Sequence, residues 1–356
     1  MVRVKKEGII LTKTQLGFEM EGVLNPAIMQ EDSTVHLFYR AVGKGNFSSI
    51  GYCKLNGPME VTFRNGTPII FPQHPYECHG VEDPRIVQIE GLYYLTYVAY
   101  DGVNALGALA LSSDMIHFEK MGIIVPQISY EEFKHLAACQ GELDEKYSRY
   151  NSHNHLLTIS SKNIFVWDKN VIFFPRRIHG KLYFLHRIKP DIQLACVGEL
   201  VELNKEFWDN YFLNLADHVL LTPRFKHEVS YIGGGAPPIE TKEGWIMIYH
   251  GVHDTTKGYV YSVCAALLDL DNPFLEVSRL PYPLFRPELE WELKGEVNNV
   301  CFPTGTSLFG DTLYIYYGAA DERIAAASLS ISALIEELLF YKFSTNENGI
   351  TANKTK

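Results

Sequence analysis

The sequence lacks the features that mark a metal site, a disulfide framework, a membrane span or a nucleic-acid-binding surface. Its six cysteines lie far apart and form no CxxC pair, which argues against structural zinc and against disulfides. No apolar run approaches the ~18 residues of a membrane-spanning helix. Lysine and arginine number 32 against 42 aspartates and glutamates, whereas nucleic acid requires clustered positive charge. We therefore expect no metal, no membrane partner and no nucleic acid partner.

The first residues also give little sign of export. The segment MVRVKKEGIILTKTQLG has two adjacent lysines but no apolar stretch of export length and no small-residue cleavage site. The expectation is a cytoplasmic protein, or a periplasmic one if a signal peptide has been removed.

Hydrophobic and aromatic residues, by contrast, are abundant. The 356 residues are 46% hydrophobic and 21% charged, so the chain can bury a sizeable core. Aromatic residues make up 13%, with 21 Tyr and 20 Phe, which favours strands and stacking surfaces over helical bundles. Because the chain exceeds the common domain size, either it divides or one large regular architecture absorbs it.

One aromatic-rich strand pattern recurs five times. Each copy begins at a turn and ends near a charged or imidazole residue. The copies are STVHLFYRAV (33–42), EGLYYLTYVAYDG (90–102), HGKLYFLHRI (179–188), EGWIMIYHGV (243–252) and GDTLYIYYGAADE (310–322). Further strand-like runs with small residues follow the copies, such as NALGALALSSD (104–114) and RIAAASLSIS (323–332). Several short strands in a repeating unit are typical of a β-propeller blade.

The sequence therefore predicts an all-β fold, a five-bladed β-propeller. A β-sandwich or two stacked β domains is the alternative on pattern alone. The segment at about 130–165 is partly helix-compatible and is interpreted as an insertion between blades, and 331–340 is predicted to form a short C-terminal helix. Residues 1–340 then form a single domain, followed by a polar C-terminal tail, 341–356.

Polar residues near the ends of the five copies are candidates for one central site. They are Arg40, Asp101, Arg187, His250 and Asp321. Taken singly, each is also explained as an exposed charge at a strand end. Their repeated position favours the hypothesis that they line one central funnel, because the inner strands of propeller blades surround one axis.

The densest polar motif is CHGVEDPRIV (78–87), just before the second copy. Pro84 disfavours a helical conformation for Asp83, so we expect an extended or turn conformation that presents the carboxylates. The plainer alternative is a turn closed by an Asp side chain and an Arg–Glu pair. A second motif, SYIGGGAPPIETKEGW (230–245), has three glycines that permit close backbone approach, but it frames neither a P-loop nor a dinucleotide fingerprint.

Five segments together carry a resemblance to a known family. LFYRA (37–41), GVEDPRI (80–86), GGGAPPIETKEGWIMIYHGV (233–252), AALLDLDNP (265–273) and YYGAADERIAAAS (316–328) resemble, in this order, glycoside hydrolase family 130, the β-mannoside phosphorylases and related β-mannosidases. The resemblance covers most of the chain, from about 22 to 330. It implies a five-bladed propeller with the active site in the central funnel, in agreement with the five copies.

The resemblance also implies roles for individual residues. Asp83 corresponds to the proton donor, which acts through a substrate hydroxyl, and Asp321 resembles the residue that hydrogen-bonds the mannosyl group. Phosphate ligands would be Arg40, Lys169, Arg187, His250 and Tyr261. Further substrate contacts are expected from Asn25, Glu82, Arg85 and Asp101. Stacking on sugar faces is expected from Tyr100, Tyr231, Tyr259 and Tyr317.

The expected activity is that of an inverting phosphorylase that converts a non-reducing-end β-mannosyl unit and phosphate into α-mannose 1-phosphate. Its partners are a β-manno-oligosaccharide or mannosylated glycan and inorganic phosphate as co-substrate, with no other cofactor. An inverting hydrolase needs a second carboxylate as base, and Glu228 or Asp168 leaves this alternative open. A non-catalytic carbohydrate-binding propeller is the alternative from another class. A homo-oligomer is also left open.

Overall fold

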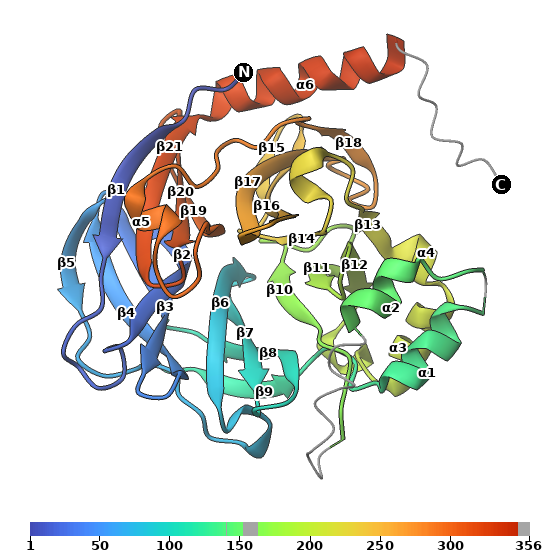
Figure 1. Cartoon of the computed structure of the whole chain (residues 1–356), viewed down its shortest axis with the longest axis horizontal. Helices are drawn as coiled ribbons and strands as arrows, with labels where there is room; N and C mark the ends of the chain where they lie inside the picture. The colour runs from blue at the N-terminus through green and yellow to red at the C-terminus, as the bar shows by residue number, and fades with distance from the viewer. Residues whose placement is uncertain (140, 152–162, 348–356) are drawn as a thin grey trace.

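The computed structural model describes residues 1–139, 141–151 and 163–347, and this part of the chain is mostly β-structure. Its 21 strands fall into consecutive antiparallel units that surround a central region in Figure 1. Most of the helices lie at the periphery of this arrangement of strands. We number five such units in chain order and call the strand that opens each unit its first strand.

Units one and two are hydrogen-bonded into one eight-stranded sheet. Unit one contains β2 (Gly22–Glu31), β3 (Thr34–Gly43), β4 (Phe47–Asn56) and β5 (Glu60–Arg64). Unit two contains β6 (Gly80–Ile89), β7 (Leu92–Tyr100), β8 (Ala105–Ser112) and β9 (Glu119–Ile123). A single parallel residue pair, Ser48–Gly80, joins β4 to β6 in the sheet, so the two units are separate antiparallel meanders.

Units three and four form a sheet each. Unit three contains β10 (Lys169–Phe173), β11 (Leu182–Arg187), β12 (Ile192–Val197) and β13 (Val219–Leu221). Unit four contains β14 (Tyr231–Gly234), β15 (Ile239–Thr241), β16 (Gly244–Thr255), β17 (Gly258–Leu268) and β18 (Glu276–Arg279).

Unit five joins the two ends of the chain. It contains β19 (Cys301–Phe309), β20 (Thr312–Ala319) and β21 (Arg323–Ser330), and its fourth strand is β1 (Lys5–Leu11) from the N-terminus. β1 pairs antiparallel with β21, with Lys5 opposite Ser328 and Leu11 opposite Ile324. The N-terminal strand therefore completes a sheet whose other strands are the last three of the chain.

The five predicted aromatic strands are confirmed as β3, β7, β11, β16 and β20. Their side chains alternate between two faces, because successive residues in a strand point in opposite directions. In β3, for example, Phe38 packs into a cluster with Leu95 of unit two, whereas Leu37 packs into a cluster with Tyr316 of unit five. The aromatic surplus thus fills both faces of the strands.

The core consists of apolar clusters that each lie between two neighbouring units. The described residues form five of them, between units one and two, two and three, three and four, four and five, and five and one. The cluster between units three and four, for instance, combines Leu185 with Trp245 and Met247. Every unit therefore packs against two neighbours, and unit five packs back against unit one.

The predicted insertion is partly helical in its described part. It contains α1 (Tyr130–Ala137), capped by Ser129, and α2 (Glu145–Asn151), whereas 152–162 lies outside the described residues. Two helices that the sequence pattern did not predict, α3 (Lys205–Leu213) and α4 (Leu215–His218), lie between β12 and β13. The rings of Phe133 in α1 and Phe212 in α3 meet edge to face at 5.3 Å, so the insertion rests on unit three.

The predicted C-terminal helix is longer than expected. α6 runs from Ile331 to Glu347, so the segment predicted to be a polar tail from 341 begins as helix, and 348–356 lies outside the described residues. The remaining helix, α5, is the short Glu290–Leu293. Among the described residues, no helix combines the length and apolarity needed to span a membrane.

Candidate active site

The first strands of units one to three each contain an Asn or Asp in the left-handed backbone conformation. Asn25 and Asp83 have φ of 51° and Asn170 has φ of 54°, and the strand register shifts at each of them. Asn and Asp tolerate this conformation better than other residues with a Cβ, and a bulge redirects a side chain. Asp83 is therefore at a bulge within β6, not in the extended or turn conformation that Pro84 was expected to impose.

These bulges bring Asp83 together with two residues of unit one. Asn25 Nδ2 donates a hydrogen bond of 2.7 Å to Asp83 Oδ1, and Arg40 Nη1 lies 3.6 Å from the same oxygen. Arg40 also pairs with Glu82 at 2.8 Å and donates to Ser48 Oγ at 2.9 Å. The predicted residues Asn25, Arg40, Glu82 and Asp83 therefore form one connected group, in which Asn25 and Glu82 are buried and Arg40 and Asp83 are partly exposed.

The charges around Asp83 keep it ionised. Burial raises the pKa of its carboxyl, but the positive charges of Arg40 and Lys169 and the hydrogen bond from Asn25 outweigh burial, so the pKa lies below its ordinary value. Asp321 behaves in the opposite way. Burial and the nearby charge of Asp83 raise its pKa to about 6. Two interacting carboxyl groups thus differ in proton affinity, which is common where acid–base chemistry occurs.

Arg85 holds the backbone of the bulge. Its Nε donates to the carbonyl of Gly235, and Nη1 donates to the carbonyls of Asp83 at 3.1 Å and Pro84 at 2.9 Å. Burial lowers its pKa to about 10, so it stays charged at neutral pH. Among the described residues its Nη2 has no partner, and a substrate contact of Arg85 stays a prediction for that atom.

Lys169 and Arg187 face one another across unit three. They are direct partners in the β10–β11 register, where like charges destabilise a sheet. Arg187 Nη1 also lies 3.3 Å from Nε2 of His250. Burial lowers the pKa of all three side chains, and the charge of Arg187 further lowers those of Lys169 and His250. His250 is therefore neutral at neutral pH and accepts from Arg187.

A close approach by Gly233 makes this position of His250 possible. Gly233 is opposite His250 in the β14–β16 register, and a Cβ on Gly233 would lie 2.5 Å from Cε1 of the imidazole. The expectation that the glycine motif allows close approach is thereby confirmed. Tyr261 completes this side, since its ring is 6.0 Å from that of His250 and its hydroxyl bonds to Tyr231.

Lys189 belongs to the same region and was missed by the sequence reasoning. Its Nζ lies 4.0 Å from the centroid of the Tyr231 ring, and Arg187 Cζ lies 5.7 Å from the same centroid. The signal was available in the sequence, because Lys189 follows Arg187 by only two residues. We call Lys169, Arg187 and Lys189 the basic cluster.

In the part of the chain that the structure describes, the basic cluster is not paired with carboxylates, and Glu82 and Asp83 act on Lys169 only through space. Within the described ranges of the chain, no Asp or Glu is in ion-pair contact with any of its three members. Burying unpaired charges is costly unless a counter-charge is supplied. The arrangement is therefore suited to binding an anion next to Asp83.

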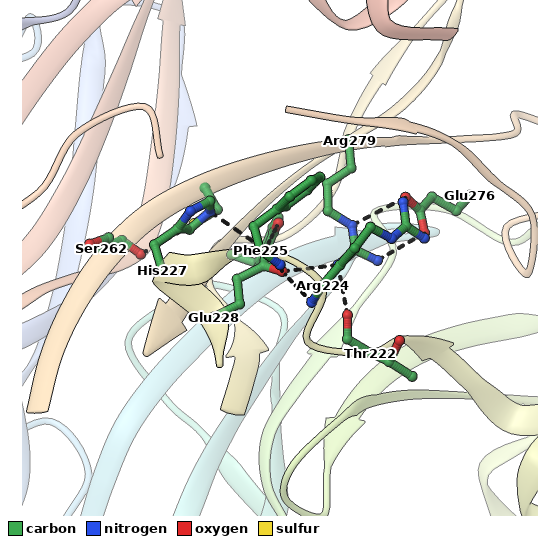
Figure 2. A network of polar contacts seen from close by, with 10 residues as sticks. Thr222, Arg224, Phe225, His227, Glu228, Ser262, Glu276 and Arg279 are labelled. Carbon is green, nitrogen blue, oxygen red and sulfur yellow. Dashed lines mark hydrogen bonds and ion pairs between the residues drawn. The ribbon is translucent and has the colours of Figure 1, made fainter. Parts of the chain in front are cut away.

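Glu228, the predicted base of a hydrolase, has a different environment. Its carboxylate accepts hydrogen bonds from the backbone N–H of Arg224 and Phe225 and lies 3.4 Å from Arg279 (Figure 2). It also accepts one from Tyr249 Oη. Tyr249 and His250 are adjacent in β16, so they point to opposite faces. Glu228 lies on the face away from the basic cluster, and its contacts argue against the predicted role as a base.

The contacts of Glu228 are one case of a repeated structural network. Glu77 and Glu292 likewise accept two backbone N–H groups, a tyrosine hydroxyl and a lysine ammonium group. The Tyr317 hydroxyl donates a hydrogen bond of 2.6 Å to Glu292, and the side chain is fully buried. The prediction that Tyr317 stacks on a sugar is therefore wrong. The three glutamates, which precede the first strands of units two, four and five, therefore anchor the loops before those strands.

The other predicted residues have separate environments. Asp168 is fully buried and lies 2.8 Å from Nδ1 of His186, so it is not free to act as a base. Asp101 accepts from the backbone N–H of Val103 at 2.8 Å and of Asn104 at 2.7 Å, which closes a turn after β7. Tyr259 is 43% exposed, and its stacking on sugar stays a prediction.

One group of metal-ligand types lies among the described residues, at His227, Glu228 and Cys264. Glu228 already accepts from a hydroxyl and two backbone N–H groups, and the guanidinium of Arg279 is beside it. A cation would compete with Arg279 for the same carboxylate. The donor set does not fit a metal ion.

The chain belongs to glycoside hydrolase family 130, a family of carbohydrate-active enzymes. The family model, described as β-1,4-mannooligosaccharide phosphorylase, matches residues 11–339. The chain is 30% identical over 341 residues to 1,2-β-oligomannan phosphorylase of Thermoanaerobacter sp. (strain X514), covering 92% of this chain and 97% of that protein. It is likewise 30% identical over 341 residues to β-1,2-mannobiose phosphorylase of the same organism, covering 92% of this chain and 96% of that protein.

Solved structures share the fold. β-1,2-Mannobiose phosphorylase from Listeria innocua, in complex with β-1,2-mannobiose, has a TM-score of 0.70 at 22% identity, covering 95% of this chain and 99% of that one. A second structure has a TM-score of 0.72 at 22% identity, covering 93% of this chain and 94% of that one. Its description says that family 130 contains glycoside hydrolases that target β-1,2 mannosidic linkages in Candida mannan. At these identities the likeness concerns the fold alone.

Proposed function

We propose that the protein is an inverting β-mannoside phosphorylase. The observation that carries this proposal is the basic cluster, which has no carboxylate partner among the described residues and lies within electrostatic reach of Asp83. Phosphate is an anionic nucleophile, so it replaces the base carboxylate of a hydrolase and needs cations to gather it. The names of the relatives support the same reaction.

In the proposed reaction, phosphate attacks the anomeric carbon of the non-reducing-end mannosyl unit from the face opposite the leaving oxygen. The new C–O bond to phosphate forms as the glycosidic bond breaks, which gives α-mannose 1-phosphate. Asp83 supplies the proton that the leaving oxygen acquires, through a sugar hydroxyl. Lys169, Arg187 and His250 orient the phosphate, and no cofactor takes part.

Phosphate binding also explains how an ionised Asp83 becomes a proton donor. In the free protein the charges of Arg40 and Lys169 lower its pKa. A phosphate dianion beside the basic cluster offsets those charges, so the pKa of Asp83 rises when the co-substrate is bound. Asp83 then carries a proton only when the nucleophile is in place, which disfavours protonation without phosphate.

We propose β-1,2-linked manno-oligosaccharides as the first substrates to test, with β-1,4 linkages second. The two relatives aligned over 92% of this chain are named for β-1,2 substrates, whereas a β-1,4-mannooligosaccharide phosphorylase of Ruminococcus albus aligns over 48%. The hydrolase alternative is weakened, because Glu228 and Asp168 are both engaged in other contacts.

We further infer that the five units are the blades of a β-propeller. The five apolar clusters between neighbouring units support a ring. A cavity of about 330 Å³ supports a common axis, since its lining includes a residue in or after each first strand, namely Ile28, Ile86, Pro175, Pro238 and Thr306. The candidate site residues Asn25, Asp83 and Lys169 precede these lining residues along their strands. The candidate site is therefore inferred to lie at the other end of this axis.

The decisive experiment is an incubation with β-1,2-mannobiose and β-1,4-mannobiose, each with and without inorganic phosphate. We expect mannose 1-phosphate only when phosphate is present. Equal release of free mannose in both buffers would show hydrolysis instead. Binding of mannobiose without any cleavage would favour a carbohydrate-binding module.

A further inference from the structure

We propose that Lys189 is a further ligand of the phosphate and that its side chain takes up a proton when the dianion binds. This inference rests on the proposed phosphorolysis and adds a residue and a pH response to it. Neither the family motif nor the repeated strand pattern includes Lys189.

The first observation is that Lys189 and Arg187 share one aromatic ring. Their cationic groups lie 4.0 Å and 5.7 Å from the centroid of Tyr231. The hydroxyl of Tyr231 bonds to Tyr261, whose ring adjoins His250. Because Arg187 contacts both Tyr231 and His250, Lys189 extends the predicted phosphate ligands along the same surface.

The second observation is that the backbone around Lys189 is held from two sides. Its carbonyl accepts a hydrogen bond of 3.2 Å from Asn151 Nδ2 of α2. The carbonyl of Pro190 accepts a hydrogen bond of 3.0 Å from the backbone N–H of Ile232 in β14. The ammonium group is therefore positioned by fixed backbone and by the Tyr231 face, as a binding group must be.

The charged and titratable groups around Lys189 are predominantly basic or phenolic. They are Lys169 of β10, Arg187 of β11, His250 of β16, Tyr231 of β14, Tyr259 and Tyr261 of β17, and Tyr150 of α2. The acid nearest in sequence, Asp191, is hydrogen-bonded to Tyr147 at 2.7 Å. Among the described residues, no carboxylate forms an ion pair with Lys189.

This environment makes proton uptake at neutral pH possible. Burial and the charges of Arg187 and Lys169 lower the pKa of Lys189 to about 7. A bound dianion favours the charged form and raises that pKa. Below about pH 7 the side chain is already protonated, so no proton is taken up. Above about pH 7, binding requires one proton, and affinity falls by up to about tenfold per pH unit.

The test uses sulfate and inorganic phosphate as probes. Sulfate keeps its charge of two throughout the range, so its titration separates the ionisation of the protein from that of the ligand. Isothermal titration calorimetry from about pH 6 to about pH 9, in two buffers of different ionisation enthalpy, gives affinity and proton uptake together. The proteins are wild type, Lys189→Met, Lys189→Arg, and the exposed control Lys181→Met.

We expect wild type and Lys181→Met to take up close to one proton above about pH 7 and to lose sulfate affinity there. Lys189→Arg should keep its affinity at about pH 9 without uptake, because arginine stays charged. Lys189→Met should bind sulfate about 100-fold more weakly at about pH 6 and show no uptake, since one charged hydrogen bond is lost.

Wild-type affinity and uptake in Lys189→Met, or persistent uptake in Lys189→Arg, would overturn the role of Lys189 while leaving phosphorolysis intact. A wild-type protein that binds neither anion and cleaves mannobiose without phosphate would overturn the proposed function itself. The Arg variant keeps the test decisive if the Met variant does not fold.

Discussion

Asn25 donates a hydrogen bond of 2.7 Å to Asp83, although 58 residues separate them in the sequence. Both residues are at bulges in first strands, and both have φ of 51°. The bond joins units one and two and, with Arg40 and Lys169, keeps the carboxyl ionised. A bulge with a left-handed residue, present in two neighbouring first strands, thereby orients the candidate acid Asp83 and helps to keep it ionised.

Replacing Asp83 with Asn should remove the proton donor. We expect turnover to fall by at least about 100-fold, the usual size of acid–base catalysis, with little change in melting temperature, since Asn suits a left-handed backbone. The matched control is Asp32→Asn, at an exposed turn with φ of 50°. Steady-state mannose 1-phosphate formation measures the effect, and an Asp83→Asn enzyme with wild-type turnover would exclude the assignment.

Replacing Arg187 with Ala should weaken phosphate binding more than sugar binding. Loss of a charged hydrogen bond predicts a KM for phosphate about 10-fold to 100-fold higher. The exposed Arg286→Ala serves as control, because its side chain is 68% exposed. Initial rates over a phosphate series at saturating mannobiose give the answer, and an unchanged phosphate KM would remove Arg187 from the site.

Replacing Glu228 with Gln should affect stability and not chemistry. The substitution removes the buried charge that accepts from Tyr249 and faces Arg279, whereas Arg279 keeps its ion pair with Glu276 at 2.8 Å, so we expect a loss of about 1–3 kcal/mol. Denaturant unfolding should show this loss, whereas Glu240→Gln at the exposed pair with Arg176 should show little. A variant of normal stability that no longer cleaves mannosides would restore Glu228 as a catalytic base.

Replacing Asp321 with Asn should stabilise the protein in a pH-dependent way. Its pKa is raised from 3.8 to about 6 in the folded state, so ionisation opposes folding increasingly between these pH values. At about pH 8 the variant should gain about 2–3 kcal/mol, and at about pH 4 almost nothing. Melting at both pH values measures it, with the exposed Asp217→Asn as control. An equal shift at both would contradict the raised pKa, and activity should fall because Asp321 is a predicted sugar contact.

The sequence predicted the strands better than the roles of individual side chains. The five aromatic strands, the helical character of the first part of 130–165 and the helix at 331–340 follow local rules of alternation and propensity, and they are confirmed. Glu228 and Tyr317 were assigned to the site but belong to buried anchoring networks. Motif proximity cannot distinguish two faces of one strand, and adjacent residues such as Tyr249 and His250 point to opposite faces.

By itself, the sequence determined the repeated units, because period-two alternation and turns are encoded by neighbouring residues. It also determined which residue types are available to the site. Only the tertiary structure decided which of them meet. Arg187 and His250 are 63 residues apart, and their contact depends on how units three and four pack. Lys189 could be recognised as a candidate phosphate ligand only in the folded protein, because its neighbours Tyr231 and Lys169 come from other strands. The burial and the nearby charges that lower its pKa likewise exist only in the assembled fold.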